Sequence, residues 1–332
     1  MKTAILLSYK GLGSNLLHLS YCHEIAKKYG PITIITLCKN LEQALAGDPL
    51  IKEIIYLEKY HKKLIDIFKL GKFLKNLSLD NIFIFYPSFR YIFSSKLAGI
   101  KKIKSYSVFK KKNLHLVNAA KKFTEIILNI QNCPTETSLY IDPIKKVNLK
   151  NKIKKTNKVK KNIILGVGSS GPTTRWGSKN FILLINKLNI NKDYFFYLLC
   201  GPNEKEISDT IIDHIGNEYC SSLSNKNISE IVPLISVCDM YIGNDSFGHH
   251  VASQSSLPSF IIMLDTPKAY TDYSKNQYRV LPDNIDENYI SHDSKISPDN
   301  ITVDIVLNKI KILFNNYSII LLKQLLLLHL LM

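Results

Sequence analysis

The densest group of polar side chains in the sequence lies at residues 243–250, which read GNDSFGHH and follow an apolar run. This stretch brings together a carboxylate (Asp245), a hydroxyl (Ser246), an amide (Asn244) and two imidazoles. A turn that enters a helix points backbone N–H groups at a ligand, and the helix end adds partial positive charge. The stretch therefore predicts a site for a polar ligand. The alternative is that Asp245 is a plain N-cap.

Metal binding is not expected here or elsewhere in the chain. His249 and His250 are adjacent, so on a helix they point about 100° apart and do not share a face as an i, i+4 pair of metal ligands does. The six cysteines are far apart, with no C-x-x-C pair and no histidine at zinc spacing. They predict buried thiols in a reducing compartment. We expect neither a metal nor a cofactor.

A second polar loop follows the apolar run 163–167. It is rich in small and hydroxyl-bearing residues and contains Gly168, Ser169, Ser170, Thr173, Thr174, Arg175 and Trp176. Its N–H and O–H donors can surround a phosphate while Arg175 neutralises the charge. No G-K-[ST] follows, which argues against a phosphate-cleaving P-loop enzyme. The alternative is a glycine-rich turn with the single tryptophan packed beneath it.

Two further loops also follow apolar runs. In Gly201-Pro202-Asn203-Glu204 the carboxylate either caps the next helix or accepts hydrogen bonds from a ribose. In Lys10-Gly11-Leu12-Gly13-Ser14-Asn15 the glycines let backbone N–H groups approach a ligand. This loop lacks the third glycine of G-x-G-x-x-G, and no acidic residue follows the second apolar run, which argues against NAD binding. Alternatively, Ser14 or Asn15 is simply an N-cap.

The elements that position these loops are short β-branched or aromatic runs that alternate with amphipathic stretches of helix length. Such alternation is typical of parallel α/β sheets, which bind ligands outside the carboxyl ends of their strands. The predicted strands are 3–8, 32–37, 53–57, 81–86, 163–167, 194–200, 239–242 and 259–264. The predicted helices are 15–28, 62–77, 178–188, 204–215, 228–237, 247–255 and 303–314.

A chain of 332 residues is long enough for two domains. We predict two Rossmann-like, doubly wound α/β domains that face each other across a cleft, at residues 1–145 and 162–314, with a basic linker at 146–161. The first apolar run is too short for a signal peptide. The apolar tail, residues 315–332, contains 14 strongly apolar positions (319–332), too few to span a bilayer. Three interpretations of the tail are equally compatible with the sequence: it contacts a membrane, it packs on the protein, or it is an accident of the reading frame.

The charge is unevenly distributed between the two halves. Residues 1–160 hold 30 Lys and Arg against 10 Asp and Glu, whereas residues 161–332 hold 14 against 17, so that the net charges are +20 and −3. A positive domain beside a near-neutral one predicts an anionic partner for the first half. The alternative is a Lys-rich composition without a functional basic face, because many of the lysines lie in the predicted linker.

Taken in order, these stretches resemble glycosyltransferase family 9, the ADP-heptose:lipopolysaccharide heptosyltransferases. The matching stretches are GVGSSGPTTRWGSKNF (166–181), LLCGPNEKE (198–206), NISEIVPLISVCDMYIGNDSFGHHVAS (227–253) and, more faintly, ILLSYKGLGSNLLHL (5–19). The third stretch closely follows the family pattern of a leucine-rich helix and G-N-D-S-G-P-x-H-L-A. Together the matches span most of residues 1–265.

The resemblance implies a GT-B fold in which the C-terminal domain binds a nucleotide sugar, with ADP-heptose the expected donor, and the N-terminal domain binds the acceptor. It implies transfer of heptose or a related sugar to a lipopolysaccharide core or similar surface glycan, with inversion and without a metal. Family positions and the loops above together make the predicted donor-binding set Gly168, Ser169, Ser170, Thr173, Thr174, Arg175, Gly201, Glu204, Asn244, Asp245, Ser246, Gly248 and His250.

One departure from the family pattern concerns the general base. The family has an Asp after the glycines of the first loop, whereas this sequence has Ser14 followed by Asn15, and neither has a carboxylate to take the acceptor's proton. His18 and His249 have suitable intrinsic pKa values. The predicted catalytic residues are therefore Ser14, His18 and His249. The predicted acceptor-side loop is Lys10, Gly11, Gly13 and Asn15.

A second departure is Phe247, which stands where the family usually has Gly, although Gly248 follows. One alternative function is a catalytically inactive nucleotide-sugar-binding protein. Another is a basic nucleic-acid-binding protein. The lysines are not interleaved with aromatic residues on one module, which argues against this function. We expect a cytoplasmic protein in peripheral contact with the inner face of the cytoplasmic membrane, an anionic lipid-linked glycan acceptor, and no nucleic acid.

Overall fold

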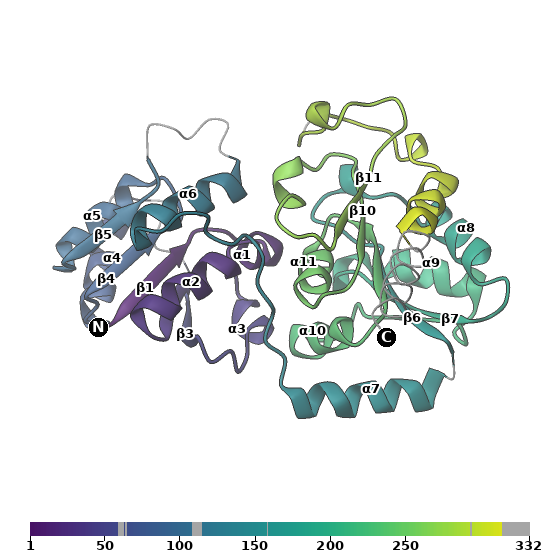
Figure 1. Cartoon of the computed structure of the whole chain (residues 1–332), viewed down its shortest axis with the longest axis horizontal. Helices are drawn as coiled ribbons and strands as arrows, with labels where there is room; N and C mark the ends of the chain where they lie inside the picture. The colour runs from purple at the N-terminus through teal and green to yellow at the C-terminus, as the bar shows by residue number, and fades with distance from the viewer. Residues whose placement is uncertain (59–62, 64, 108–114, 158, 293, 314–332) are drawn as a thin grey trace, which may run out of the picture.

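The structure is a computed structural model of the chain, and it describes residues 1–58, 63, 65–107, 115–157, 159–292 and 294–313. Two α/β domains lie side by side, and an extended segment followed by helix α7 (Pro143–Asn157) connects them (Figure 1). The apolar tail predicted at 315–332 lies outside the described residues. Among the helices of the described part, none combines the length and the apolar character that a membrane span needs.

The N-terminal domain contains a parallel five-stranded sheet in the order β3-β2-β1-β4-β5. Its strands are β1 (Thr3–Leu7), β2 (Ile32–Thr36), β3 (Ile51–Tyr56), β4 (Asn81–Ile84) and β5 (Lys102–Ser105). Its helices are α1 (Leu12–Leu16), α2 (Leu19–Tyr29), α3 (Leu41–Ala44), α4 (Ile65–Asn76), α5 (Phe89–Leu97) and α6 (Leu116–Leu128).

Both faces of this sheet are covered by helices. Side chains alternate along β1, so that Ile5 and Leu7 share a core with α2 and α6, whereas Ala4 and Leu6 share another with α4 and α5. Every residue of β1, β2 and β4 is buried. This explains why these strands are mostly apolar along their length and do not alternate apolar with exposed polar residues.

The C-terminal domain contains a parallel six-stranded sheet in the order β11-β10-β9-β6-β7-β8. Its strands are β6 (Lys161–Gly166), β7 (Tyr194–Leu199), β8 (Cys220–Ser222), β9 (Met240–Asn244), β10 (Ser259–Ile262) and β11 (Gln277–Val280). Its helices are α8 (Ser178–Leu188), α9 (Lys205–Ile215), α10 (Ile228–Ser236), α11 (Phe247–Gln254) and a helical stretch at 303–313. The predicted elements of this half are all present, to within two residues at their described ends, and β8 and β11 add to them.

The predicted helix 15–28 is wrong as a single element, because the helix is interrupted at residues 17–18. The His18 side chain supplies the reason. Its Nδ1 lies 2.7 Å from the Ser14 carbonyl oxygen and donates to it, while the backbone N–H of His18 donates to Asn15 instead. The side chain thus takes the place of a backbone N–H, and α2 begins at Leu19.

The predicted linker is largely the helix α7, which lies along the C-terminal domain (Figure 1). Ile153 is the one buried residue of this helix, which explains why the sequence lacks an apolar period there. Lys145 Nζ donates to the Ser229 carbonyl at 3.2 Å, and Asn157 Nδ2 donates to Tyr197 Oη at 2.9 Å. Both ends of α7 are therefore tied to the C-terminal domain.

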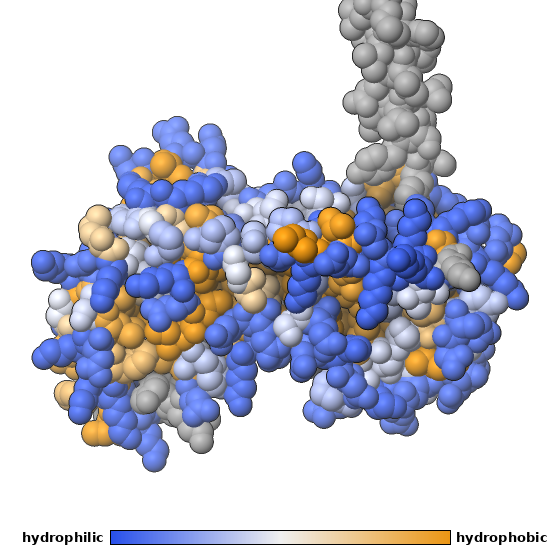
Figure 2. Space-filling view, turned by 90° about the horizontal axis from the view of Figure 1, so that it is seen from below, coloured by the Kyte–Doolittle hydropathy of each residue, from blue (hydrophilic) through white to orange (hydrophobic). Residues whose placement is uncertain are grey.

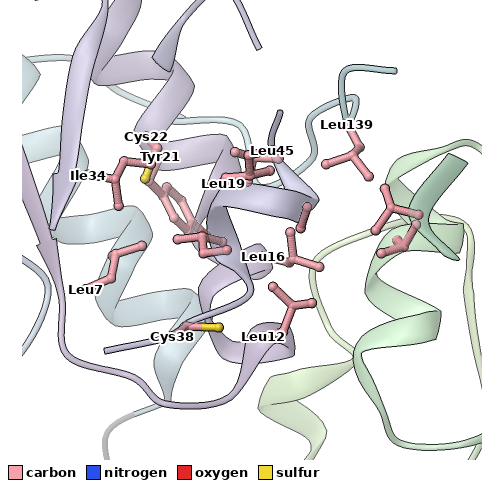
Figure 3. Packing of buried hydrophobic residues seen from close by; sticks show 14 of the residues in the cluster. Leu7, Leu12, Leu16, Leu19, Tyr21, Cys22, Ile34, Cys38, Leu45 and Leu139 are labelled. Atoms are coloured by element: carbon pink, nitrogen blue, oxygen red, sulfur yellow. The ribbon is translucent and has the colours of Figure 1, made fainter. Parts of the chain in front are cut away.

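The two domains share a hydrophobic core where α1 meets the C-terminal domain. Figure 3 shows Leu12 and Leu16 of α1 in this buried cluster. Val251 of α11 and Ile235 of α10 belong to the same cluster. Gln254 Nε2 donates to the Leu16 carbonyl at 2.8 Å across this interface. Because full burial of a leucine stabilises by roughly 1.5–3 kcal/mol, this contact holds the glycine loop of the first domain against the second.

Candidate active site

The start of α1 with its N-cap Gly11 (residues 11–14, which we call the glycine loop) meets loops of the C-terminal domain at one cavity of about 370 Å³. The residues that line it are Gly11, Leu12, Gly13 and Ser14 from the N-terminal domain, and Gly168, Ser169, Ser170, Thr174, Leu199, Cys200, Gly201, Glu204, Asp245, Ser246, Phe247, His250, Asp265, Thr266, Tyr270 and His292 from the C-terminal domain. The strand order reverses between β1 and β4 in one sheet and between β6 and β9 in the other. Parallel sheets bind ligands at such reversals.

The turn between β9 and α11 presents a helix N-terminus to this cavity. Ser246 is the N-cap, and its Oγ accepts from the Gly248 N–H at 3.2 Å. Asp245 is thus not the N-cap and faces the cavity instead. A Cβ at Gly248 would lie 2.7 Å from the Tyr241 ring, so glycine lets α11 approach the sheet this closely. The first N–H groups of α11 favour an anion in the cavity.

Two side chains hold the Asp245 carboxylate. His249 Nε2 donates to Asp245 Oδ1 at 2.6 Å, and Thr266 Oγ1 donates to Oδ2 at 3.3 Å. Gln277 Nε2 donates to His249 Nδ1 at 3.2 Å, which fixes a neutral imidazole with its proton on Nε2. His249 is fully buried and does not line the cavity. It orients Asp245 rather than reaching a ligand.

His250 is buried but lies at the wall of the cavity. Its Nδ1 is 2.6 Å from Tyr273 Oη, and the two rings stack. Desolvation by burial, together with the neighbouring His249, holds the pKa of His250 well below its usual range, so the imidazole is neutral at pH 7. A Cβ at Gly13 would lie 2.8 Å from His250 Nε2. This nitrogen therefore faces the glycine loop of the other domain.

Asp245, His249 and His250 offer metal-ligand atoms within 4.8 Å of one another. The centroids of the two imidazole rings are 3.9 Å apart, so the expectation that adjacent histidines diverge on a helix is wrong here. Side-chain rotation about Cβ brings the rings together. However, both His249 nitrogens and both Asp245 oxygens have protein partners. A metal ion would have to break this network, and the donor set therefore does not fit one.

The loop after β6 is held against the β9 turn by Asn244. This fully buried side chain accepts from the Trp176 N–H at 2.9 Å and donates to the Val167 carbonyl at 2.9 Å. Trp176 is itself fully buried, and its indole N–H donates to the Ile301 carbonyl at 2.7 Å. Asn244 and Trp176 thus position the loop without lining the cavity.

Glu204 holds the neighbouring loop after β7. Its carboxylate accepts from the Ser169 N–H at 2.9 Å and from the Gly201 N–H at 3.0 Å, and Arg175 pairs with it at 2.8 Å. The bond to Gly201 is the predicted helix-capping contact. A Cβ at Gly168 would overlap this carboxylate, so glycine is required there for the two loops to meet.

On the opposite wall, Asn15 holds the glycine loop from behind. Its amide donates to the Gly11 carbonyl at 2.7 Å and accepts from Thr36 Oγ1 at 2.8 Å. Ser14 lines the cavity together with Tyr270 from the C-terminal domain. His18 is fully buried among aromatic rings and stacks on Tyr9. It does not reach the cavity.

The family model of glycosyltransferase family 9 (heptosyltransferase) matches residues 88–288, more than half of the chain. The chain belongs to this family. It is therefore a glycosyltransferase. No curated protein gives a significant sequence match.

Solved structures of family 9 proteins share its fold. The Escherichia coli ADP-heptose lipopolysaccharide heptosyltransferase II is similar at a TM-score of 0.74 and 19% identity, over 96% of this chain and 100% of that chain. A family 9 glycosyltransferase from Veillonella parvula is similar at a TM-score of 0.72 and 16% identity, over 95% of this chain and 97% of that chain. The E. coli heptosyltransferase WaaC with ADP is similar at a TM-score of 0.69 and 13% identity, over 94% of this chain and 99% of that chain. These likenesses confirm the GT-B fold of two Rossmann-like domains.

In this family 9 glycosyltransferase, most predicted site residues meet at the cavity. Those that line it are Gly11, Gly13, Ser14, Gly168, Ser169, Ser170, Thr174, Gly201, Glu204, Asp245, Ser246 and His250. Those that do not are Lys10, Asn15, His18, Thr173, Arg175, Asn244, Gly248 and His249. The second group mostly positions the first, except that Thr173 is exposed and Lys10 lines another cavity.

Four polar residues of the cavity wall are absent from the predicted set. Asp265 and Thr266 follow β10, so the rule that ligands lie beyond strand ends would have found them. Asp265 is 2% exposed, and its Oδ1 accepts from Ser294 Oγ at 3.1 Å. Tyr270 ends the short 3₁₀ helix Lys268–Tyr270, and His292 lies in an irregular segment after β11, so no local pattern marks them.

Proposed function

We propose that this glycosyltransferase moves heptose or a related sugar from a nucleotide sugar, with ADP-heptose the first candidate, to a lipopolysaccharide-core or similar surface-glycan acceptor. The observation that carries the proposal is that the cavity has one wall from each domain, the glycine loop on one side and the β6, β7 and β9 loops on the other. A donor bound to the second wall exposes its sugar to an acceptor bound to the first.

Neutral donors hold the diphosphate in this proposal. The described residues that line the cavity include no Lys or Arg, and Arg175 pairs with Glu204 behind the wall. The backbone N–H groups of Ser170 and of the start of α11, together with the hydroxyl of Ser246, are the partners we assign to phosphate oxygens, because the Ser169 N–H and the Thr174 hydroxyl already donate within the protein. Carboxylates repel a diphosphate but accept hydrogen bonds from hydroxyls, so Glu204 and Asp265 bind the ribose and sugar.

Asp245 takes the acceptor's proton in this mechanism. Ser14 has no carboxylate, and His18 and His249 do not reach the cavity. Asp245 lines the cavity that Ser14 also lines, and His249 Nε2 holds its carboxylate at 2.6 Å, so Asp245 is the carboxylate that we assign to the acceptor's proton. His249 acts through Asp245 as a positioning residue.

The reaction is a single displacement with inversion and without a metal. The acceptor oxygen bonds to the anomeric carbon while the bond from that carbon to the diphosphate oxygen breaks. The electron pair leaves with the nucleoside diphosphate, whose charge the loop amides and the α11 N-terminus stabilise. The acceptor's proton passes to Asp245.

The acceptor side is cationic, in keeping with an anionic, lipid-linked glycan. A second cavity of about 870 Å³ in the N-terminal domain shares Leu12 with the donor cavity. Four lysines line it, against two carboxylates: Lys10, Lys39, Lys63 and Lys69, with Glu58 and Asp66. We assign the anionic part of the acceptor to these lysines. The protein then works in the cytoplasm, in peripheral contact with the inner face of the cytoplasmic membrane.

The test combines binding with transfer. Purified protein is incubated with ADP-heptose and a set of lipopolysaccharide-core acceptors, and both ADP release and the mass of the acceptor are followed. We expect transfer, and we expect Asp245→Asn to lower kcat by about 10²- to 10⁴-fold while ADP affinity by calorimetry stays within about threefold. Intact ADP binding without transfer to any acceptor would refute the proposal.

Ser14 favours a second candidate, a nucleotide-sugar-binding protein without transfer activity. In that case Ser14→Asp, which supplies the carboxylate of the family pattern, creates a transfer activity that the unaltered chain lacks. If Asp245 is the base, the unaltered chain is active, and Ser14→Asp is not required for turnover.

A further inference from the structure

Helices α4 and α5 carry hydrophobic side chains on their outer faces that the core does not use. Phe68 of α4 is 61% exposed and Phe93 of α5 is 52% exposed, and Ile65 and Leu97 are also exposed. The inner faces of the same helices bury Leu70, Leu74 and Tyr91 against the sheet. Each helix is therefore apolar on two sides, whereas a helix that only covers a sheet needs one apolar side.

The two outer faces form a single surface, which we call the α4–α5 face and define by Ile65, Phe68, Phe93 and Leu97. Ser94 Oγ of α5 donates to the Ile67 carbonyl of α4 at 2.9 Å. A Cβ at Gly71 of α4 would lie 3.2 Å from Leu97 Cβ, so the helices touch without a gap. Hydrophobic residues reach the surface of the N-terminal domain at the left of Figure 2, bordered by hydrophilic ones.

The α4–α5 face is bordered by positive charge. Lys69, Lys72 and Lys96 are exposed, and none forms an ion pair with a carboxylate in the described part of the chain. The two acidic residues between 65 and 97 are Asp66, which is buried, and Asp80, which accepts from the Lys2 N–H at 2.8 Å. Exposed aromatic residues among unpaired lysines are complementary to an anionic lipid surface, in which rings enter the acyl boundary and lysines meet headgroups.

The position of this face in the fold fits the same partner. Ile65 and Lys69 also line the lysine-rich cavity of the N-terminal domain, which shares Leu12 with the donor cavity. A surface that continues into the acceptor cavity is where the lipid end of a membrane-embedded acceptor would be found. Helix α7 also exposes Ile144 and Val147 beside lysines, but it lines neither of these cavities.

We propose that the α4–α5 face docks on an anionic membrane. The proposal deepens the membrane contact in the proposed function by naming the surface and the lipid charge. Its readout is vesicle binding, so it can fail while sugar transfer is retained, and transfer can fail while vesicle binding is retained.

The test is sedimentation of the full chain with vesicles. We expect binding to phosphatidylcholine vesicles that contain about 30% phosphatidylglycerol, weak binding to phosphatidylcholine alone, and loss of affinity as salt rises. Phe68→Ser/Phe93→Ser is expected to weaken binding by about tenfold or more. Lys72→Gln/Lys96→Gln is expected to weaken it by about fivefold per lysine. Far-UV circular dichroism and ADP affinity should stay unchanged, because these side chains are exposed and lie outside both cavities.

Ile144→Ser/Val147→Ser on α7 is the matched control, with similar exposure and similar neighbouring charge, and it should bind vesicles as the unaltered chain does. Three results would overturn the proposal. They are equal binding by the α4–α5 variants, loss of binding in the α7 variant, and light scattering that shows a dimer which Phe68→Ser/Phe93→Ser converts to a monomer. Absence of vesicle binding by the unaltered chain would do so as well.

Discussion

The burial of His18 makes the stability of the protein depend on pH in a way that separates a structural histidine from a catalytic one. Its Nδ1–H donates to the Ser14 carbonyl at 2.7 Å, and its Nε2 is buried without a hydrogen-bond partner in the described part of the chain. Protonation would place an unpaired charge on Nε2. Desolvation by burial therefore lowers the pKa of His18 to about 4.

The size of the effect follows from proton linkage. The unfolded chain takes up a proton at His18 near pH 6.5, whereas the folded chain does so near pH 4. The contribution of neutral His18 to the free energy of unfolding is therefore complete above about pH 6.5 and is lost as the pH falls toward 4. Each pH unit between these two values changes the free energy of unfolding by about 1.4 kcal/mol. His18 alone thus removes about 2 kcal/mol from the free energy of unfolding between about pH 7.5 and about pH 5.

The assay compares the unaltered chain with His18→Asn, which keeps a donor for the Ser14 carbonyl and cannot be protonated. Urea unfolding is followed at both pH values by circular dichroism and by fluorescence of Trp176, the single tryptophan, which is fully buried. Other titrating groups cancel in the comparison, so the variant should lose about 2 kcal/mol less than the unaltered chain. Equal losses, or a fall in kcat of catalytic size without a loss of stability, would refute the structural role.

Two further substitutions test how the cavity wall is held. Gly168→Ala introduces a Cβ that overlaps the Glu204 carboxylate, so we expect a loss of about 1–3 kcal/mol in the free energy of unfolding and weaker ADP binding by calorimetry; unchanged ADP affinity would contradict this. Asn244→Ala leaves the Trp176 N–H and the Val167 carbonyl buried without their partner, which should cost about 2–5 kcal/mol in urea unfolding. A cost below about 1 kcal/mol would show that the loop does not depend on this side chain.

Much of the fold could be predicted because both sheets are parallel and covered on two faces. Strands such as β1 and β9 are continuous apolar runs between polar turns, and this pattern needs no knowledge of the rest of the chain. Helix α7 was harder, because a helix with one buried residue has no apolar period. The interruption at residues 17–18 was hidden for another reason. It depends on one hydrogen bond from the His18 side chain.

The candidate site was also predictable only in part. Loops that follow strands were found from the sequence, since topology alone brings strand ends together. Which side chain of a loop faces the ligand was not predictable, because hydrogen bonds between loops decide it. Asn244 turns to Trp176 and Val167, and Arg175 turns to Glu204, so both lie behind the wall they were expected to line. Tyr270 joins Ser14 at the cavity wall from a segment distant in sequence.

The proposed function gives the two walls different tasks, and the distribution of lysines agrees with them. A wall that must release a nucleoside diphosphate after each turnover is better made of neutral N–H and O–H groups, since a buried lysine or arginine would bind the product's added negative charge tightly and slow its departure. The described residues of the donor cavity fit this requirement, with no Lys or Arg lining it. Lysines instead gather at the second cavity and beside the α4–α5 face, where solvent and salt moderate their attraction to an anion. The net charge of +20 in residues 1–160 is therefore compatible with release of the leaving group, because part of it lies on α7 and none of the described lysines lines the donor cavity.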